Sequence, residues 1–280
     1  MNIGDFNRIN KKNKIIKRRK KNNRIYKNIH NKAKPVFVLS TGRVGTKFLT
    51  KVISNSEKIN SYHEPTPELI YYARYAYENQ SLNEELKRII DAARLEYILY
   101  STINNKLYFE SNNRITFFAN QLEQLYPKAK FIHIVRHPGA FVRSGIRRKW
   151  YSNNQVWDMG RIVPFSQDIK WEEMSLISKI SWLWNETNKF VETFKNEIPA
   201  YKILTIKSED LFDNHNTINK IFRFIDVKNP YSRKEIKNLL NRPVNAQKIN
   251  EFPKYKNWSK QQKEELRKYS NLAKKYNYNI

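Results

Sequence analysis

Two segments of the sequence combine glycine, hydroxyl and basic residues in spacings that suit the binding of phosphate. The first segment, residues 40–48, reads Ser-Thr-Gly-Arg-Val-Gly-Thr-Lys-Phe and follows a short apolar run. A glycine-bearing turn that enters a helix presents unpaired backbone N–H groups and the positive end of the helix dipole. Gly42 and Gly45 allow an anion to approach the backbone closely. The segment is therefore predicted to hold a phosphate, with Arg43 and Lys47 supplying positive charge.

The second segment begins where another apolar run ends. Arg136 directly follows residues 131–135, and Ser144 lies eight residues later, in a helix that is expected to begin at Pro138. Side chains from the end of a parallel strand and from the next helix converge beside the sheet, where open α/β sheets bind ligands. An Arg can grip a phosphate with two hydrogen bonds, and a Ser can donate one more. Two such anion sites match an adenosine that carries phosphates at both its 5′ and its 3′ positions.

An ATP-dependent P-loop kinase is the first alternative interpretation of these segments. A Walker A loop places Lys and then Ser or Thr after its last glycine, whereas here Thr46 precedes Lys47. The residues that follow two later strands, Arg136 and Lys207, are basic, so no Asp stands there to bind Mg²⁺. The kinase interpretation would require both ATP and Mg²⁺.

A parallel sheet is needed to position the two segments, and the rest of the sequence predicts one. Short apolar runs alternate with longer stretches that have apolar residues at helical spacing. We therefore predict an α/β fold with a mainly parallel central sheet and helices on both faces. The expected strands are 36–39, 60–62, 107–109, 131–135 and 201–206, and the expected helices are 48–53, 66–79, 83–101, 114–125, 138–149, 172–195, 216–225, 232–240 and 259–275.

The composition limits the class of protein. The chain has 280 residues, of which 40% are hydrophobic, and this is enough for a sizeable core. It has no cysteine, which excludes disulfides, thiolate metal sites and a Cys nucleophile. No apolar run reaches the roughly 18 residues of a membrane span, and the N-terminus lacks the apolar region of a secretory signal. We therefore expect a soluble, cytoplasmic protein.

The charge is strongly positive, with 53 Lys and Arg against 26 Asp and Glu. Such a field attracts nucleic acid, anionic lipid, acidic polysaccharide or nucleotides without choosing among them. Residues 1–34 hold 13 of the basic residues against one acid, and we interpret them as a basic tail or arm ahead of a domain at 35–280. The arm could contact an anionic membrane or polymer. A nucleic-acid-binding protein is the second alternative, but it does not account for two anion motifs at strand–helix junctions.

The two phosphate segments resemble those of the sulfotransferases that use 3′-phosphoadenosine-5′-phosphosulfate (PAPS). Residues 40–49 are similar to the family's 5′-phosphosulfate loop, and residues 135–144, Val-Arg-His-Pro-Gly-Ala-Phe-Val-Arg-Ser, are similar to its 3′-phosphate motif. The resemblance implies a P-loop-like sulfotransferase fold and transfer of a sulfuryl group from PAPS to an acceptor hydroxyl, with 3′-phosphoadenosine-5′-phosphate (PAP) as the product and no metal required. Weaker similarities extend it over about 35–280, at 208–211, 243–245, Trp258 and 276–278.

The resemblance also assigns roles to single residues. Arg43 occupies the position of the basic residue that stabilises charge on the bridging oxygen of the leaving group. Thr46 and nearby backbone amides should hold the 5′-phosphate, whereas Lys47 departs from the more usual Ser or Thr and so removes a hydroxyl contact. The implied nucleotide-binding residues are Gly42, Arg43, Val44, Gly45, Thr46, Lys47, Phe48, Arg136 and Ser144.

A general base must take the proton of the acceptor, and the residues after the expected second strand can supply one. His63-Glu64-Pro65 would be aimed into the cleft over the first phosphate segment. The Glu-Pro pair resembles the carboxylate branch of the family, so Glu64 is preferred and His63 is the second candidate. The other interpretation is that both side chains merely cap or pair beside Pro65.

The acceptor is expected to be a hydroxyl group of a carbohydrate or glycan. The positive field suits an acidic polymer, and the stretch 150–171, which contains three Trp, could stack on sugars. Small metabolites and tyrosine stay open as acceptors.

Overall fold

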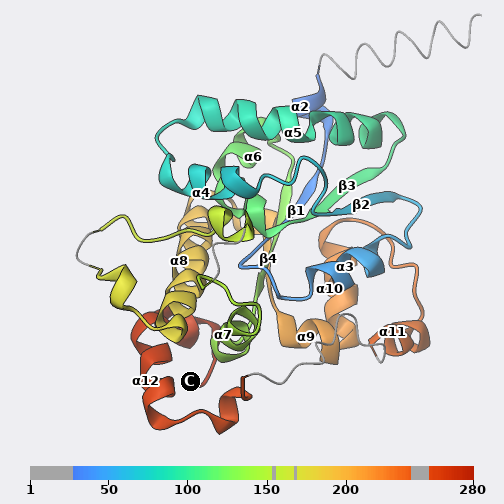
Figure 1. The fold of residues 1–280 in the computed structure, drawn as a ribbon. Helices are drawn as coiled ribbons and strands as arrows, with labels where there is room; N and C mark the ends of the chain where they lie inside the picture. The colour runs from blue at the N-terminus through green and yellow to red at the C-terminus, as the bar shows by residue number, and fades with distance from the viewer. Residues whose placement is uncertain (1–27, 153–155, 167–168, 241–251) are drawn as a thin grey trace, which may run out of the picture.

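The computed structural model describes residues 28–152, 156–166, 169–240 and 252–280, and its centre is a five-stranded sheet (Figure 1). The sheet has the order β2-β3-β1-β4-β5, and every neighbouring pair of strands is parallel. The predicted α/β fold with a parallel sheet is therefore confirmed. The strands are β1 (Val36–Ser40), β2 (Ile59–His63), β3 (Leu107–Ser111), β4 (Lys130–Val135) and β5 (Ile203–Lys207).

Helices connect the strands and cover both faces of the sheet. Figure 1 shows α6 and α8 on one side of the sheet and α3 and α10 on the other. Up to β4 the helices are α2 (Ile29–Lys32), α3 (Thr46–Ile53), α4 (Ile70–Glu78), α5 (Asn83–Ile103), the 3₁₀ helix η1 (Asn113–Phe118) and α6 (Ala119–Leu125). After β4 they are α7 (Pro138–Ile146), η2 (Val156–Gly160), η3 (Trp171–Glu173), α8 (Leu176–Glu197), η4 (Ala200–Lys202), α9 (Ser208–Asp213), α10 (His215–Phe224), α11 (Arg233–Leu240), η5 (Tyr255–Asn257), α12 (Lys260–Tyr269) and η6 (Asn271–Tyr276).

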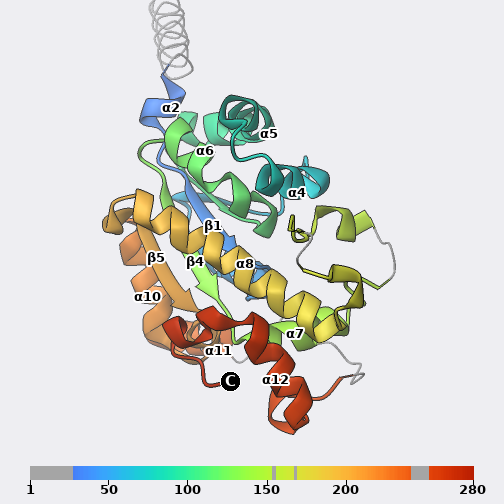
Figure 2. The same cartoon turned by 90° about the vertical axis from the view of Figure 1, so that its left-hand side faces the viewer.

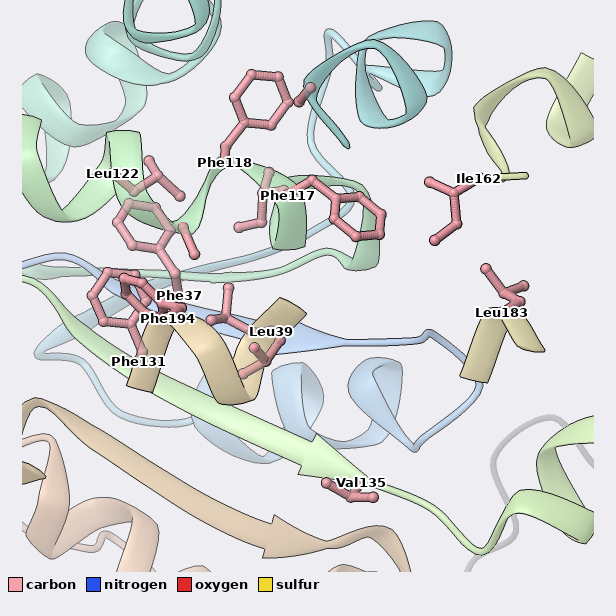
Figure 3. Close-up of a cluster of buried hydrophobic side chains, with 14 of the residues drawn as sticks. Phe37, Leu39, Phe117, Phe118, Leu122, Phe131, Val135, Ile162, Leu183 and Phe194 are labelled. Atoms are coloured by element: carbon pink, nitrogen blue, oxygen red, sulfur yellow. The ribbon is translucent and has the colours of Figure 1, made fainter. Parts of the chain in front are cut away.

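The central strand β1 shows why both faces are covered. All five of its residues are buried, as a continuous apolar run in a parallel sheet predicts. Phe37 and Leu39 belong to the hydrophobic cluster that includes Phe194 of α8 (Figure 3). Val36 and Val38 belong to a second cluster, with residues of α3 and α10. Because successive side chains of a strand face opposite sides, β1 anchors both layers of helices.

The strand order reverses between β1 and β4, at the centre of the sheet. From β1 the chain goes on to β2 and β3 on one side, whereas β4 and β5 lie on the other side. The two strands pair in register as far as Ser40 and Ile134, so their carboxyl ends finish next to each other. Open α/β sheets bind ligands in the crevice at such a reversal. The two predicted phosphate segments therefore begin at neighbouring strand ends.

Several predicted helices have different limits in the structure. The helix expected at 66–79 begins only at Ile70, because the carbonyl groups of Pro67 and Glu68 accept hydrogen bonds from Arg94 and Arg114 outside any helix. The helix expected at 114–125 starts as the 3₁₀ helix η1 before it continues as α6.

Three further helices are shorter than expected. The helix expected at 138–149 ends at Ile146, and Lys149 has a left-handed backbone with φ of 56°. The helix expected at 172–195 begins after the capping residue Ser175 and runs to Glu197. The last helix, expected at 259–275, divides after α12, where the backbone N–H of Leu272 donates to the side chain of Asn185 in α8.

The helix α2 precedes the first strand and packs against α5. Ile29 and Ala33 are buried, and Nε2 of His30 lies 2.9 Å from a carboxylate oxygen of Asp91. Residues 1–27 of the predicted basic arm lie outside the described residues, as does the similarity at 243–245, so both stay predictions. No helix in the described part of the chain is long and apolar enough to cross a membrane.

Candidate functional site

A cavity of about 590 Å³ lies at the carboxyl ends of the strands. Residues that follow each of the five strands contribute to its lining. Among them are Arg43, Glu64, Arg114, Arg136 and Ser208. This is the edge at which a parallel α/β sheet binds its ligands. The sequence predicted site residues after β1, β2 and β4, and all three segments reach this one cavity.

The turn after β1 is shaped for the close approach of an anion. Gly42, Arg43 and Gly45 have φ of 78°, 57° and 91°, in the left-handed region that glycine adopts readily. Gly45 is the N-cap of α3, and no side chain caps this helix. A Cβ on Gly45 would lie 2.7 Å from the ring of Phe212, so a larger residue would force a shift. The first N–H groups of α3 are thus positioned for an anion.

Arg136 reaches from the end of β4 back to this turn. Its guanidinium donates a hydrogen bond of 2.6 Å to the backbone carbonyl of Arg43. Burial lowers the pKa of Arg136, and the nearby positive charge of Arg43 also lowers it, whereas the carboxylate of Glu209 acts in the opposite direction. The structure therefore brings together the two segments that the sequence suggested for opposite phosphates of one nucleotide.

Arg148 adds a third guanidinium to the same cavity. Burial, followed by the charges of Arg43, Arg147 and Arg136, lowers its pKa to about 10. The Nε atom of Arg43 is buried and has no hydrogen-bond partner within the described residues. Positive charges held close together in a partly buried place disfavour one another. A multiply charged anion would therefore stabilise this arrangement.

Ser144, the predicted partner of Arg136, is connected to the cavity through Arg148. Arg148 donates hydrogen bonds to the hydroxyl of Ser144 at 2.9 Å and to its backbone carbonyl at 3.2 Å. Arg148 borders the cavity, whereas Ser144 does not. The nucleotide-binding residues that the resemblance implies do not include Arg148. Its i,i+4 spacing from Ser144 is the signal that could have singled it out.

The remaining residues of the predicted phosphate turn differ in burial and in whether they border the cavity. Thr46 is buried at the first position of α3, and Lys47 is exposed, and both border the cavity. Phe48 also borders it and packs on Phe212 with 5.1 Å between ring centroids. Val44 is fully buried in the hydrophobic cluster shared with α3. Val44 can therefore offer a ligand its backbone but not its side chain.

His63 is the last residue of β2 and borders the cavity with one ring nitrogen engaged. Its Nδ1 lies 3.1 Å from the backbone carbonyl of Ser111 and 2.9 Å from the hydroxyl of the same residue. A carbonyl can only accept, so this contact assigns the hydrogen to Nδ1 and leaves Nε2 as the accepting nitrogen. The hydroxyl of Ser111 in turn lies 2.5 Å from that of Thr50. The ring of His63 is thus held in one orientation.

Glu64 follows at once and has a left-handed backbone, with φ of 49°. Such a conformation costs a residue with a Cβ about 1–2 kcal/mol, and strained residues of this kind cluster at functional sites. The backbone N–H of Glu64 donates to the carbonyl of Ser111 at 3.1 Å. Its carboxylate lies 3.6 Å from the guanidinium of Arg114 and interacts electrostatically with Arg43. Both predicted bases therefore border the cavity beside the phosphate turn.

Part of the cavity lies beyond these residues, and the sequence analysis pointed to it only through the stretch 150–171. Its apolar lining comes from Phe117, Trp150, Ile162 and Leu183. Figure 3 shows Phe117, Ile162 and Leu183 pointing from three separate segments toward a common space. Trp150 and Ile162 lie in the stretch 150–171 that was expected to contact sugars, whereas no local spacing joins Phe117 and Leu183 to it, so the sequence carried no signal for those two. Among the described residues, no group of three or more His, Asp or Glu could hold a metal ion.

Comparison with protein families gives one match. The model of a family described as "Sulfotransferase family" matches residues 35–231. This range holds both phosphate segments, the two candidate bases and all five strands. No curated protein matches the chain at a significant level.

Solved structures with the same architecture include three sulfotransferases or sulfotransferase domains. The sulfotransferase domain from the Synechococcus PCC 7002 olefin synthase aligns over 89% of this chain and 96% of its own, with a TM-score of 0.53 and 17% identity. The sulfotransferase domain from the curacin biosynthetic pathway aligns over 78% of this chain and 80% of its own, with a TM-score of 0.51 and 15% identity. Sulfotransferase STF9 from Mycobacterium avium aligns over 89% of this chain and 78% of its own, with a TM-score of 0.53 and 10% identity. At these identities the likeness shows the fold alone.

Proposed function

The chain belongs to the sulfotransferase family, and from this premise we propose that it transfers a sulfuryl group from PAPS to a hydroxyl group of a carbohydrate or glycan. One observation carries the choice of donor, the 2.6 Å hydrogen bond from Arg136 to the backbone carbonyl of Arg43. It joins the two phosphate segments at neighbouring strand ends, and PAPS has phosphate groups on opposite sides of its adenosine that need two such sites.

The donor would be held mainly through its negative charges. The 5′-phosphosulfate would lie against the turn at 42–45 and the N-terminus of α3, where uncapped N–H groups suit an anion. The 3′-phosphate would be bound by Arg136 and Arg148, and Ser144 would act by holding Arg148. Hydrogen bonds between Arg and phosphate are charge-assisted and contribute about 1.5–3 kcal/mol each.

The transfer exchanges one S–O bond for another. The acceptor oxygen forms a bond to sulfur while the bond from sulfur to the bridging oxygen of the phosphosulfate breaks, and PAP leaves. Negative charge grows on that bridging oxygen. Arg43 would neutralise it, and its Nε has no competing partner within the described residues. The loose transition state resembles that of phosphoryl transfer, in which positioning and electrostatics supply the catalysis.

The proton of the acceptor hydroxyl passes to a base at the edge of the same cavity. Glu64 is our first choice, because its carboxylate interacts with Arg43 and its left-handed backbone is of the kind that clusters at functional sites. His63 is the second choice, through Nε2. General-base assistance of this kind contributes about 10²–10⁴-fold in rate.

The proposed reaction needs no metal ion. Kinases use Mg²⁺ to neutralise the charge of a transferred phosphoryl group and its leaving group. Here the guanidinium groups of Arg43, Arg136 and Arg148 border the donor part of the cavity and would supply that positive charge.

Thermal unfolding in the presence of ligands tests the choice of donor. PAP with EDTA should raise the melting temperature by several degrees, because a ligand that binds the native state stabilises it, and ATP with Mg²⁺ should raise it less. The variant Arg136→Ala should lose most of the shift caused by PAP. Arg223→Ala, which changes an exposed residue of α10, should keep it. A larger shift with ATP and Mg²⁺ than with PAP would overturn the proposed donor.

A further inference from the structure

The cavity has a second part, away from the phosphate turn, and its walls are apolar. Phe117, Trp150, Ile162 and Leu183 contribute side chains that are at least nine-tenths buried yet border the cavity. Three of these side chains converge on one space in Figure 3. This part adjoins His63 and Glu64, the candidate bases, so it is where the acceptor must lie if the proposed function holds.

Two arginines also border this part, and each has carboxylate partners inside the protein. Arg161 lies 2.7 Å from the carboxylate of Asp158. Arg114 lies 3.6 Å from that of Glu64 and 3.5 Å from that of Glu68. The side chains of Arg161 and Asp158 are 16% and 14% exposed, so this pair is largely withdrawn from water. The side chain of Arg114 is 13% exposed, whereas those of Glu64 and Glu68 are 35% and 41% exposed. The positive charge on the acceptor side is therefore balanced by the protein itself.

The donor side of the cavity, next to the phosphate turn, has a different balance of charge. Within the described residues, Arg43, Arg136 and Arg148 have no carboxylate at ion-pair distance. Glu64 acts on Arg43 and Glu209 acts on Arg136 only from beyond ion-pair distance. An incoming anion would therefore find an excess of positive charge there and balanced charge on the acceptor side. The net charge of the whole chain, +27, does not show this difference between the two parts of the cavity.

We propose that the acceptor is an uncharged glycoside whose aryl or alkyl group rests against Phe117, Ile162 and Leu183. The inference rests on the proposed function and narrows it. A carboxylate on the acceptor would be desolvated without a free cation and would face the carboxylate of Glu64, and both effects disfavour it. An acidic polymer, which the overall charge suggests, is therefore not the molecule that enters this site.

Three glycosides that share one aglycone provide the test. They are p-nitrophenyl β-glucoside, which is neutral, the corresponding β-glucuronide, which carries a carboxylate, and the corresponding 2-amino-2-deoxy-β-glucoside, which carries an ammonium group. Transfer of labelled sulfuryl from PAPS should proceed with a kcat/KM at least about tenfold higher for the glucoside than for either charged analogue. The carboxylates and guanidinium groups of this part are already paired with one another, so neither a carboxylate nor an ammonium group of the acceptor would find a free partner. An equal or higher kcat/KM for a charged analogue, or no transfer to the glucoside, would overturn the inference.

A pair of leucine variants tests the apolar wall. Leu183→Ala should raise the KM for p-nitrophenyl glucoside severalfold and leave both the KM for methyl glucoside and the affinity for PAP nearly unchanged. Leu82→Ala, which alters a leucine that is 42% exposed and borders no part of the cavity, is the matched control. If Leu183→Ala fails to fold, Ile162→Val, which makes a smaller change in the same wall, replaces it in the same comparison of KM values. Equal KM changes for both glucosides would contradict a contact with the aglycone.

Titration with PAP separates failure of this inference from failure of the proposed function. If PAP binds and the glucoside is no acceptor, the assignment of the acceptor is wrong and the sulfotransferase with a PAPS donor stands. If PAP itself does not bind, the proposed donor is wrong, and the acceptor inference falls with it.

Discussion

At the scale of single residues, different features of the structure favour Glu64 and His63 as the general base. Glu64 has a strained backbone and a carboxylate next to Arg43 and Arg114. His63 has its Nδ1 bound to Ser111, which leaves Nε2 to accept a proton. A carboxylate can act as a base when it is ionised, and an imidazole can do so when it is neutral. Both residues border the cavity in which the acceptor would lie. Mutation can distinguish them.

Glu64→Gln should lower kcat by about 10²–10⁴-fold, because it removes the base and preserves the shape of the side chain. The affinity for PAP should change little, since residue 64 belongs to the acceptor side. Steady-state kinetics together with PAP titration would check this, with His63→Gln measured in parallel. A larger loss of kcat in His63→Gln than in Glu64→Gln would transfer the role of base to His63.

Arg148 and Ser144 should act as one unit in binding the donor. Arg148→Ala should weaken PAP binding by about tenfold or more, because a charge-assisted hydrogen bond to phosphate is lost. Ser144→Ala should weaken it less, since the hydroxyl holds Arg148. The double variant should bind PAP about as weakly as Arg148→Ala alone. Additive losses in a calorimetric double-mutant cycle would instead indicate that Ser144 contacts the phosphate independently.

At the scale of elements, the C-terminal segment supports the turn after β4. The hydroxyl of Tyr278 donates to one carboxylate oxygen of Glu209 at 2.7 Å, and the other oxygen accepts from the backbone N–H of His137 at 3.0 Å. Burial raises the pKa of Tyr278, and the nearby carboxylate of Glu209 raises it further. Two segments that are far apart in the sequence thus fix the position of the residue that follows Arg136.

Tyr278→Phe should therefore loosen this turn without removing any group that contacts substrate. The KM for PAPS should rise severalfold while kcat and the KM for the acceptor stay nearly constant, because the lost bonds, to Glu209 and to the carbonyl of Val135, hold the residues on either side of Arg136. Tyr201→Phe, which alters an exposed tyrosine on η4, is the control. A fall in kcat with an unchanged KM for PAPS would contradict a role in donor binding.

The elements themselves could be predicted from the sequence where a local pattern determines them. The apolar run 36–39 and the glycine turn that follows it identified β1, the turn and the start of α3. Helix limits were wrong where distant groups take the backbone hydrogen bonds, as Arg94 and Arg114 do before α4. Phe117 and Leu183 of the apolar wall were missed because η1 and α8 meet the stretch 150–171 only in the folded chain.

At the scale of the whole molecule, one buried histidine couples stability to pH. His133 lies in β4 with no exposed surface, and its Nε2 is 2.9 Å from the side-chain oxygen of Asn188. Burial lowers the pKa of His133 to about 3, and the charge of Lys195 contributes. In the unfolded chain the pKa of a His is about 6.5. Between these two values the unfolded state binds a proton that the folded state does not.

The free energy of unfolding should therefore fall as the pH drops from about 6.5 toward 3, by up to about 1.4 kcal/mol per pH unit from this residue. His133→Gln should show a shallower fall between pH 6.5 and 5, a range above that in which carboxylates such as Glu192 gain protons. Urea unfolding of both proteins at several pH values in this range measures the difference. Parallel curves would show that His133 does not titrate differently in the two states.

The central claim is that two anion sites at neighbouring strand ends grip opposite phosphates of one adenosine. Calorimetric titration in EDTA with PAP, adenosine 5′-monophosphate and adenosine 3′-monophosphate tests it most directly. PAP should bind at least about tenfold more tightly than either monophosphate, because each loses the charge-assisted hydrogen bonds of one site. If either monophosphate binds as tightly as PAP, one of the two sites is not used and the account is contradicted.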